Sequence, residues 1–428
     1  MKELCPVCNT EYSQSVKVCE LCGFADELGI NRTWLIAEDA ENWLNNVVRP
    51  YREKWHSNIK KMKIPKPGAE EYINRAEEYR RNNDYDRGIA EINEAIRLYP
   101  DYIDAYYVRA SMYSLKKDLD SAIADYSEII RLDPNNKDAY SIRGSAYEQK
   151  GDIDLAISDY VKAIPVNIFD WIMYGNRGRL YLKKGDFDRA IADFSEVIRL
   201  IPGYGVAYNE RGDAYLKKGD FDLAIADFNE AIRLDPNNGY NYNNRGYAYL
   251  RKGNFDLAIS DYNEAIRLVP DYGLAYGNRG YAYLQKGGLD LAIADFNEAI
   301  RLDPNYANTY NNRGYAYRRK GDVDLAIADY NEAIRLDINF AFAYYNRGNA
   351  YLQEGDLDRA IADSSKAIEL NPNYALAYAN CGTAYKKLGK KDQAIKNFAK
   401  ALSLDSKLDW VLKELQEIKS TKNGNGNQ

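Results

Sequence analysis

Apolar and small residues return along most of the chain in two alternating groups. The first group follows spacings of i, i+4 and i+7, as in Tyr242, Gly246 and Tyr249. The second follows after a polar stretch, as in Ala258, Tyr262 and Ala265. Residues at such intervals lie on one face of an α-helix. The pattern therefore predicts pairs of amphipathic helices, and a single pair cannot bury its own apolar face.

The pairs recur every 34 residues, so that ten units without an insertion fill residues 69–408. We count positions within each unit from its first residue, which is Ala69 in the first unit. Position 8 is Gly or Ala in every unit, position 4 and position 11 are Tyr in every unit, and position 20 is Ala in nine. Stacked copies of one helical pair bury a continuous core, with each unit contacting its neighbours.

The residues between the helices predict where each helix ends. Gly219 suits the left-handed position that closes a first helix, and Asp222, whose position is Asp in all ten units, is expected to cap the second helix. The run 235–237, Asp-Pro-Asn, stops that helix because proline cannot continue it. In the third unit Pro165 falls inside the second helix, so we expect that helix to end near Ile164 and to separate a divergent three-unit part from a regular seven-unit part.

The aromatic, Gly, Tyr, Ala, aromatic and Pro columns at this period resemble the tetratricopeptide repeat family. The resemblance implies an all-α fold, a right-handed α-α superhelical solenoid of ten hairpins, that acts as a non-enzymatic interaction scaffold. A C-terminal capping helix is expected over 409–420, with Trp410, Leu412, Leu415 and Ile418 on its apolar face, and residues 421–428 are expected to be disordered.

The resemblance also implies a concave groove lined by positions 2, 5, 6, 9 and 12 or 13 of the first helices. Position 6 is Asn in seven units, and an amide can both donate to and accept from a peptide backbone. We interpret these residues as a ladder that binds extended peptides of partner proteins; the alternative is that they only decorate a helix surface after recent duplication. Lys is absent from position 5 and Lys and Arg from position 2, which disfavours the family's binding of acidic chaperone tails. The candidate groove residues are Asn176, Asn244, Asn278, Asn312, Asn346, Asn380, Tyr247, Tyr281 and Tyr315.

A second polar column is interpreted as structural. Position 7 is Arg and position 23 is Asp or Glu in nine units, and the tenth unit lacks both because it has Cys381 and Asn397. Loss of both partners together predicts an Arg–carboxylate pair between the two helices of each unit. Cys381 is then a small packing residue rather than a nucleophile.

The N-terminus contains two Cys-x-x-Cys pairs, with Cys5 and Cys8 in the first and Cys19 and Cys22 in the second. Four thiolates supply the tetrahedral shell that structural zinc prefers. We predict a zinc ribbon over residues 1–24 whose folding depends on the metal. An iron centre and redox-active thiols are the alternatives.

Residues 25–68 are predicted to form two further helices and a short linker. The second of these helices, at 50–63, is basic and amphipathic, so it either caps the first repeat or lies on an anionic surface. Two alternative functions follow: a zinc-ribbon adaptor that contacts nucleic acid or an anionic surface through residues 1–68, and an accessory subunit of an enzyme complex.

Composition narrows these possibilities. The net charge of −6 over 428 residues disfavours a general nucleic-acid coat. His56 is the sole histidine and has no nucleophile pattern nearby, so no catalytic residue is assigned. We expect no membrane span and no secretory signal, and a cytoplasmic location in which cysteine pairs bind metal more often than they form disulfides.

Overall fold

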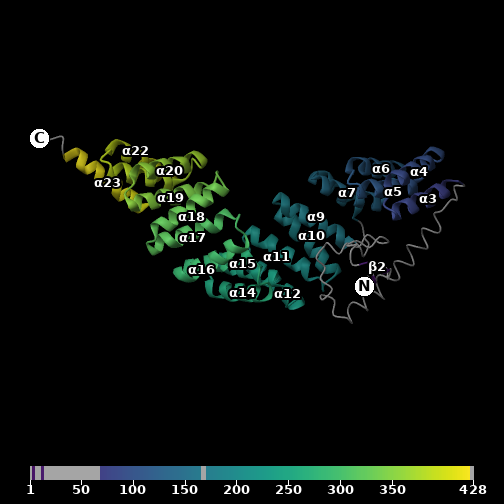
Figure 1. The fold of residues 1–428 in the computed structure, drawn as a ribbon, viewed down its shortest axis with the longest axis horizontal. Helices are drawn as coiled ribbons and strands as arrows, with labels where there is room; N and C mark the ends of the chain where they lie inside the picture. The colour runs from purple at the N-terminus through teal and green to yellow at the C-terminus, as the bar shows by residue number, and fades with distance from the viewer. Residues whose placement is uncertain (1, 5–10, 14–67, 165–169, 425–428) are drawn as a thin grey trace. The chain divides into compact units, whose positions relative to one another are not determined.

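The computed structural model describes residues 2–4, 11–13, 68–164 and 170–424. It contains two compact units, Met1–Pro236 and Asn237–Gln428, and each consists of stacked antiparallel helical hairpins (Figure 1). The boundary between the units follows the fifth repeat, not the third as the position of Pro165 suggested. The zinc ligands and the basic helix predicted from the sequence lie outside the described residues.

The described part of the first unit begins with two short strands, β1 (Lys2–Leu4) and β2 (Glu11–Ser13), which pair antiparallel with Glu3 opposite Tyr12. Five hairpins follow: α3 (Ala69–Arg81) with α4 (Tyr85–Leu98), α5 (Ile103–Leu115) with α6 (Leu119–Leu132), α7 (Lys137–Lys150) with α8 (Ile153–Ala163), α9 (Asp170–Lys184) with α10 (Phe187–Leu200), and α11 (Gly205–Lys218) with α12 (Phe221–Leu234).

The second unit contains five more hairpins and a final helix. They are α13 (Gly239–Arg251) with α14 (Phe255–Leu268), α15 (Gly273–Lys286) with α16 (Leu289–Leu302), α17 (Ala307–Lys320) with α18 (Val323–Leu336), α19 (Ala341–Glu354) with α20 (Leu357–Leu370), α21 (Ala375–Lys387) with α22 (Lys391–Leu404), and α23 (Asp409–Gly424). The helical pairs predicted from the 34-residue period are therefore confirmed in both units.

Most helix ends lie where the sequence predicted them. Gly219 closes α11 with a left-handed φ of 96°, and α12 ends one residue before Asp235. In the third repeat α8 ends at Ala163 after 11 residues, whereas α6 has 14. The early stop expected from Pro165 is confirmed.

The predicted N-cap of the second helices was wrong by two residues. The N-cap of α12 is Asp220, at position 16, and Asp222 lies in the first turn. In the first repeat Asp84, at this earlier position, accepts a hydrogen bond from the backbone N–H of Arg87. Six aspartates at position 18 have another role, because they bind Lys at position 14 of the following repeat, with 2.6 Å from Lys150 Nζ to Asp120. These ion pairs link neighbouring repeats.

The small residue at position 8 lets the two helices of a hairpin approach closely. An added Cβ on Gly246 would lie 2.9 Å from the ring of Tyr262, and one on Gly280 would lie 2.9 Å from the ring of Phe296. Both rings are fully buried. Each aromatic ring at position 24 thus fills the space that the facing glycine leaves.

The arginine at position 7 joins three helices. Arg279 Nε and Nη2 donate to the two carboxylate oxygens of Asp295 at 2.8 and 2.7 Å, and Nη1 donates to Asn263 of the preceding repeat at 2.6 Å. Its guanidinium also lies 5.4 Å from the ring centroid of Tyr276. The carboxylate is 7% exposed. The predicted Arg–carboxylate pair is confirmed.

Burial makes several carboxylates of this ladder depend on the charge of their arginines. Desolvation raises the pKa of Asp193, Asp261 and Asp329, and the paired arginine opposes the shift by stabilising the charged form.

The tenth repeat has no such pair. There Cys381 is buried, its Sγ lies 3.9 Å from Ser365 Oγ, and burial raises the pKa of its thiol. This protonated thiol is a packing group, as predicted.

The C-terminal helix α23 covers the last hairpin. Val411, Leu415 and Ile418 are buried in a cluster with Phe398 of α22. Trp410 and Leu412, which were predicted to face inward, are 45% and 42% exposed. The helix also extends to Gly424, beyond the expected end at residue 420.

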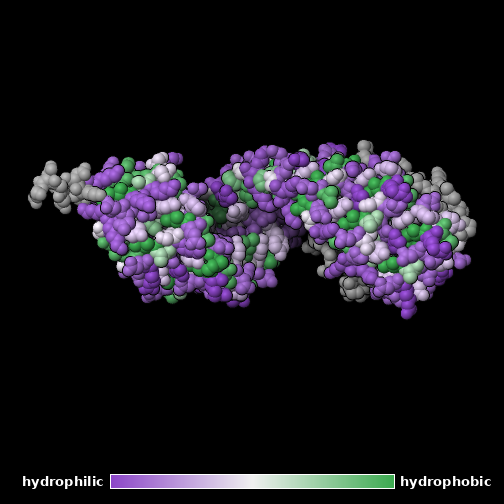
Figure 2. Space-filling view, turned by 90° about the horizontal axis from the view of Figure 1, so that it is seen from above, coloured by the Kyte–Doolittle hydropathy of each residue, from purple (hydrophilic) through white to green (hydrophobic). Residues whose placement is uncertain are grey.

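The described surface is largely polar. Figure 2 shows hydrophilic residues over most of the visible face, with apolar residues scattered between them. None of the helices in residues 68–164 and 170–424 is both long enough and apolar enough to cross a bilayer.

Replacing Arg279 by Cys should lower the free energy of unfolding by about 3–5 kcal/mol, because Asp295 would be left buried without its cation. The double change Arg279→Cys with Asp295→Asn reproduces the tenth repeat and should recover at least about half of that loss. Urea unfolding of the full chain, followed by circular dichroism as a double-mutant cycle, measures both. Losses that simply add would contradict the ladder's energetic role.

Candidate binding groove

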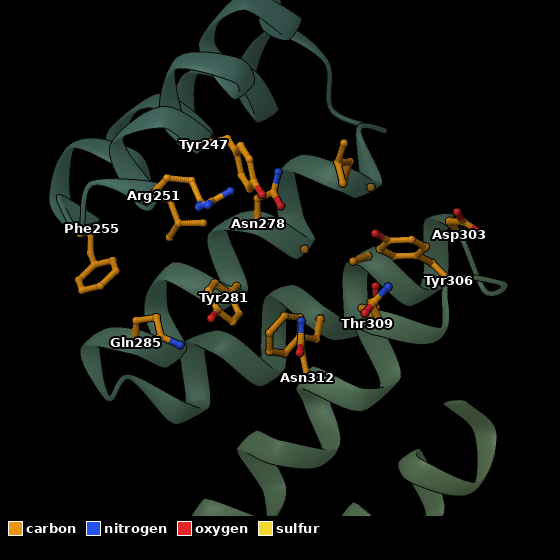
Figure 3. Close-up of a pocket in the computed structure, with 18 residues that line it drawn as sticks. Tyr247, Arg251, Phe255, Asn278, Tyr281, Gln285, Asp303, Tyr306, Thr309 and Asn312 are labelled. Carbon is orange, nitrogen blue, oxygen red and sulfur yellow. The ribbon is translucent and has the colours of Figure 1, made fainter. Parts of the chain in front are cut away.

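The second unit contains a cavity of about 920 Å³ that opens between its first helices. Its wall comes mainly from α13, α15 and α17, so it spans the sixth, seventh and eighth repeats (Figure 3). The lining is mixed: Tyr247, Leu250, Arg251, Gly253, Phe255, Gly273, Leu274, Gly277, Asn278, Tyr281, Gln285, Phe296, Ala299, Asp303, Tyr306, Asn308, Thr309 and Asn312.

The same helix positions recur along this wall. Position 6 supplies Asn278 and Asn312, and position 9 supplies Tyr247 and Tyr281. In Figure 3, Tyr247 extends from α13 toward Asn278 of α15. These four residues belong to the set predicted from the sequence, and the cavity brings them together.

A glycine opens the centre of the cavity. Gly277 occupies position 5, where the neighbouring repeats have Asn243 and Asn311. An added Cβ at Gly277 would meet only Ala299 Cβ, at 3.9 Å. The space that an asparagine side chain would fill is therefore part of the groove. Sequence analysis did not single out this position, because position 5 differs widely between repeats.

The asparagines of the ladder bind one another. Asn278 Nδ2 donates to Asn243 Oδ1 at 3.1 Å, and Asn346 Nδ2 donates to Asn311 Oδ1 at 2.9 Å. Asn243 Nδ2 in turn donates to Asn244 Oδ1 at 3.3 Å. Asparagine side chains at position 6 thus bind asparagine side chains at position 5 of the preceding repeat. The sequence analysis did not predict these contacts.

The other predicted residues lie in different surroundings. Asn346 and Asn380 are 8% and 6% exposed, so they are buried beneath the groove surface. Tyr315 is partly buried and lies over the guanidinium of Arg318, 5.3 Å from ring centroid to Cζ. None of these three residues lines the cavity.

Asn176 belongs to the first unit and to a charged cluster there. Its Oδ1 accepts from Arg179 Nη2 at 2.5 Å, and Arg179 Nη1 donates to Glu210 at 3.1 Å. Burial raises the pKa of Glu210 while Arg179 opposes the shift, and burial raises the pKa of Tyr204 beside it to about 12. Here position 6 of the next repeat is Glu210 rather than Asn, so the ladder is interrupted by an ion pair.

Variants of Asn346 and Asn312 distinguish an asparagine that stabilises the fold from one that lines the groove. Changing Asn346 to Ala should cost about 1–2 kcal/mol of unfolding free energy, because the buried carbonyl of Asn311 loses its donor. Changing Asn312 to Ala should cost less than about 0.5 kcal/mol, since its one amide contact, from Asn311, is 3.5 Å long. Urea unfolding measures both variants. Equal losses would contradict this assignment.

Family models match most of the repeat region. A model described as tetratricopeptide repeat matches residues 73–137, 118–167, 176–239 and 243–307. Further models of the same repeat match residues 296–328, 314–355, 348–389 and 375–408. Among curated protein sequences none matches the chain.

Several solved structures are similar to parts of this chain. The crystal structure of MamA is 32% identical over 38% of this chain and 95% of that chain, with a TM-score of 0.35. YrrB, described as a TPR protein with an unusual peptide-binding site, is 22% identical over 44% of this chain and 97% of its own, with a TM-score of 0.38. The APC/C hetero-tetramer Cut9-Hcn1 is 14% identical over 82% of this chain and 96% of that chain, with a TM-score of 0.47. On the period, the hairpins and the matched models, this chain belongs to the tetratricopeptide repeat family.

Proposed function

We propose that this protein is an interaction scaffold that binds extended peptide segments of partner proteins in the groove of α13, α15 and α17. The observation on which this depends is the cavity at Gly277, flanked by Tyr247 and Tyr281. Proteins of this repeat family generally act as non-catalytic scaffolds, and repeated helices provide a surface that is already formed before a partner arrives. Preorganisation of that kind lowers the entropic cost of binding.

The lining suits a peptide in three ways. The amides of Asn278 and Asn312 can pair with a peptide backbone whatever its side chains are. The tyrosine rings offer large apolar faces at small entropic cost, together with a hydroxyl group. The recess over Gly277 can receive a side chain of the peptide, which would fix its register.

Filling the recess tests this function. Peptides selected from a random library on the full-length protein should bind Gly277→Phe at least about tenfold more weakly than wild type, because the new ring occupies the recess. The control is Gly277→Ala, which adds only a methyl group, should leave binding unchanged and should stabilise α15 by about 0.5–1 kcal/mol. Fluorescence anisotropy with the selected peptides measures the affinities. Peptides that bind Gly277→Phe as well as wild type would show that they bind elsewhere.

We also propose that Cys5, Cys8, Cys19 and Cys22 bind one structural zinc ion. The supporting observation is the β1–β2 pair, since Cys5 follows β1 directly and Cys8 lies in the same connection between the strands. Short hairpins with two cysteines in the turn supply half of a tetrahedral thiolate site. The adaptor role of residues 1–68 stays a prediction, because the basic helix lies outside the described residues.

The zinc proposal predicts about one zinc ion per purified chain, measured by inductively coupled plasma mass spectrometry. Changing Cys19 and Cys22 to Ser should remove the metal, because two ligands are too few for a structural site. The matched control is Cys381→Ser, which should leave the metal content unchanged. Iron in place of zinc, or full metal content in the double variant, would contradict the proposal.

A further inference from the structure

Asparagines at positions 5 and 6 of the second unit form a chain of side-chain amides. At one end of this chain, Asn346 Nδ2 donates to Asn311 Oδ1 at 2.9 Å, and Asn311 Nδ2 lies 3.5 Å from Asn312 Oδ1. At the other end, Asn278 Nδ2 donates to Asn243 Oδ1 at 3.1 Å, and Asn243 Nδ2 donates at 3.3 Å to the asparagine that follows it. Each of these asparagines at position 5 therefore accepts from the following repeat and donates within its own repeat.

The chain of amides is interrupted between its two ends, because position 5 of the seventh repeat is Gly277. The pattern on either side would place a carboxamide there that accepts from Asn312 Nδ2 and donates to Asn278 Oδ1. Neither of these two atoms has a hydrogen-bond partner among the residues that the structure describes. Both side chains line the cavity, Asn278 from α15 and Asn312 from α17 (Figure 3). One donor and one acceptor are thus left for a group that enters the recess.

A second interruption differs, because it leaves no opening. Position 5 of the ninth repeat is Tyr345, whose ring packs against Tyr374 with 4.8 Å between the ring centroids. Asn380 in the tenth repeat is 6% exposed, and its Nδ2 is buried without a partner among the described residues. That donor is out of reach of a ligand, whereas Asn312 is open to the cavity.

We propose that the groove selects peptides with an Asn or Gln side chain whose carboxamide enters the recess at Gly277 and bridges Asn312 and Asn278. The proposal rests on the peptide-binding function proposed above and names the side chain that is recognised. The carbonyl of the carboxamide would accept from Asn312 Nδ2, and its amino group would donate to Asn278 Oδ1. An Asp or Glu side chain has no donor and would place a carboxylate oxygen against Asn278 Oδ1, and a Leu side chain can make neither contact.

The depth of the recess favours a side chain over the peptide backbone. Asn243 and Asn311, at the corresponding position of the neighbouring repeats, are 3% and 8% exposed. In the seventh repeat this place is open, because Gly277 itself lines the cavity together with the buried residues Phe296 and Ala299. A backbone that follows the groove lies above this level, and a side chain can descend from it.

The charges of the wall also favour a neutral group. The residues that line the cavity include one basic residue, Arg251, and one acidic residue, Asp303. Their charges balance, so the wall has no excess charge to compensate a carboxylate or an ammonium group that is removed from water. A carboxamide carries no charge and brings both kinds of polar atom that the two asparagines require.

Peptides selected from the random library on the full-length protein provide the first test. Those that Gly277→Phe blocks should each contain an Asn or Gln whose replacement by Leu, or by the corresponding acid, weakens binding at least about tenfold in fluorescence anisotropy. Asn312→Ala should weaken the same peptides at least about fivefold, because one hydrogen bond is lost. The matched control is Asn308→Ala, the same change on the same helix and cavity wall, which should change the affinity less than about twofold.

The variant Gly277→Asn tests the recess without a peptide. Its own carboxamide should complete the chain of amides, whereas Gly277→Asp places an acceptor against Asn278 Oδ1. Since Asn and Asp have similar helix propensities, Gly277→Asn should melt at least about 1 °C above Gly277→Asp in circular dichroism. It should also bind the selected peptides at least about tenfold more weakly than wild type, because it occupies both amide contacts itself.

The outcomes separate this proposal from the function on which it rests. Peptides that Gly277→Phe blocks, but that tolerate replacement of every Asn and Gln, would overturn the carboxamide proposal and leave the groove function intact. Equal melting temperatures of Gly277→Asn and Gly277→Asp would also overturn the carboxamide proposal. Peptides that Gly277→Phe does not affect, or a library that yields no binder, would overturn the groove function itself.

Discussion

In nine of the ten repeats, packing depends on the ion pair that the arginine at position 7 makes. Arg313 binds both oxygens of Asp329 on its own second helix and Asn297 on the second helix before it, while its guanidinium lies over Tyr310. One side chain therefore fixes a first helix against two second helices. A buried ion pair of this kind adds little net stability compared with an apolar contact, but its geometry allows few alternatives. It sets the register between hairpins, which the alanine-rich core alone would define less sharply.

Because this pair holds each first helix in place, positions 5, 9 and 12 can vary between repeats without loss of the array. A substitution at one of these positions changes the shape of the surface only in its own repeat and the adjacent one, but it can open or close a cavity there. A glycine at 277 opens a cavity, and an asparagine at the same position in the adjacent repeats closes the space with an amide contact. Repeats with nearly identical sequences therefore differ at positions that shape the groove.

The sequence predicted the helical pairs, their ends and the Arg–carboxylate ladder, because these depend on contacts that recur at one spacing. The prediction from the sequence was wrong where two nearby residues were both suited to one structural position. In the loop after Gly219, Asp220 and Asp222 both suit an N-cap, and the tight left-handed turn selects Asp220. In α23 a shift of one residue turns Val411 inward and Trp410 outward. The cavity at Gly277 and the burial of Asn346 could not be predicted, since both depend on neighbouring repeats in three dimensions.

Two arginines that each lie beside a tyrosine ring differ in their hydrogen-bond partners. Arg347 lies over Tyr344 and is satisfied by Asp363. Arg318 lies over Tyr315 at a similar distance, yet its Nε has no acceptor among the described residues. A buried donor without a partner costs free energy in the folded chain. Beside it, burial raises the pKa of the Tyr330 hydroxyl and the charge of Arg318 opposes that rise, so Arg318 is surrounded by tyrosines where Arg347 is matched by a carboxylate.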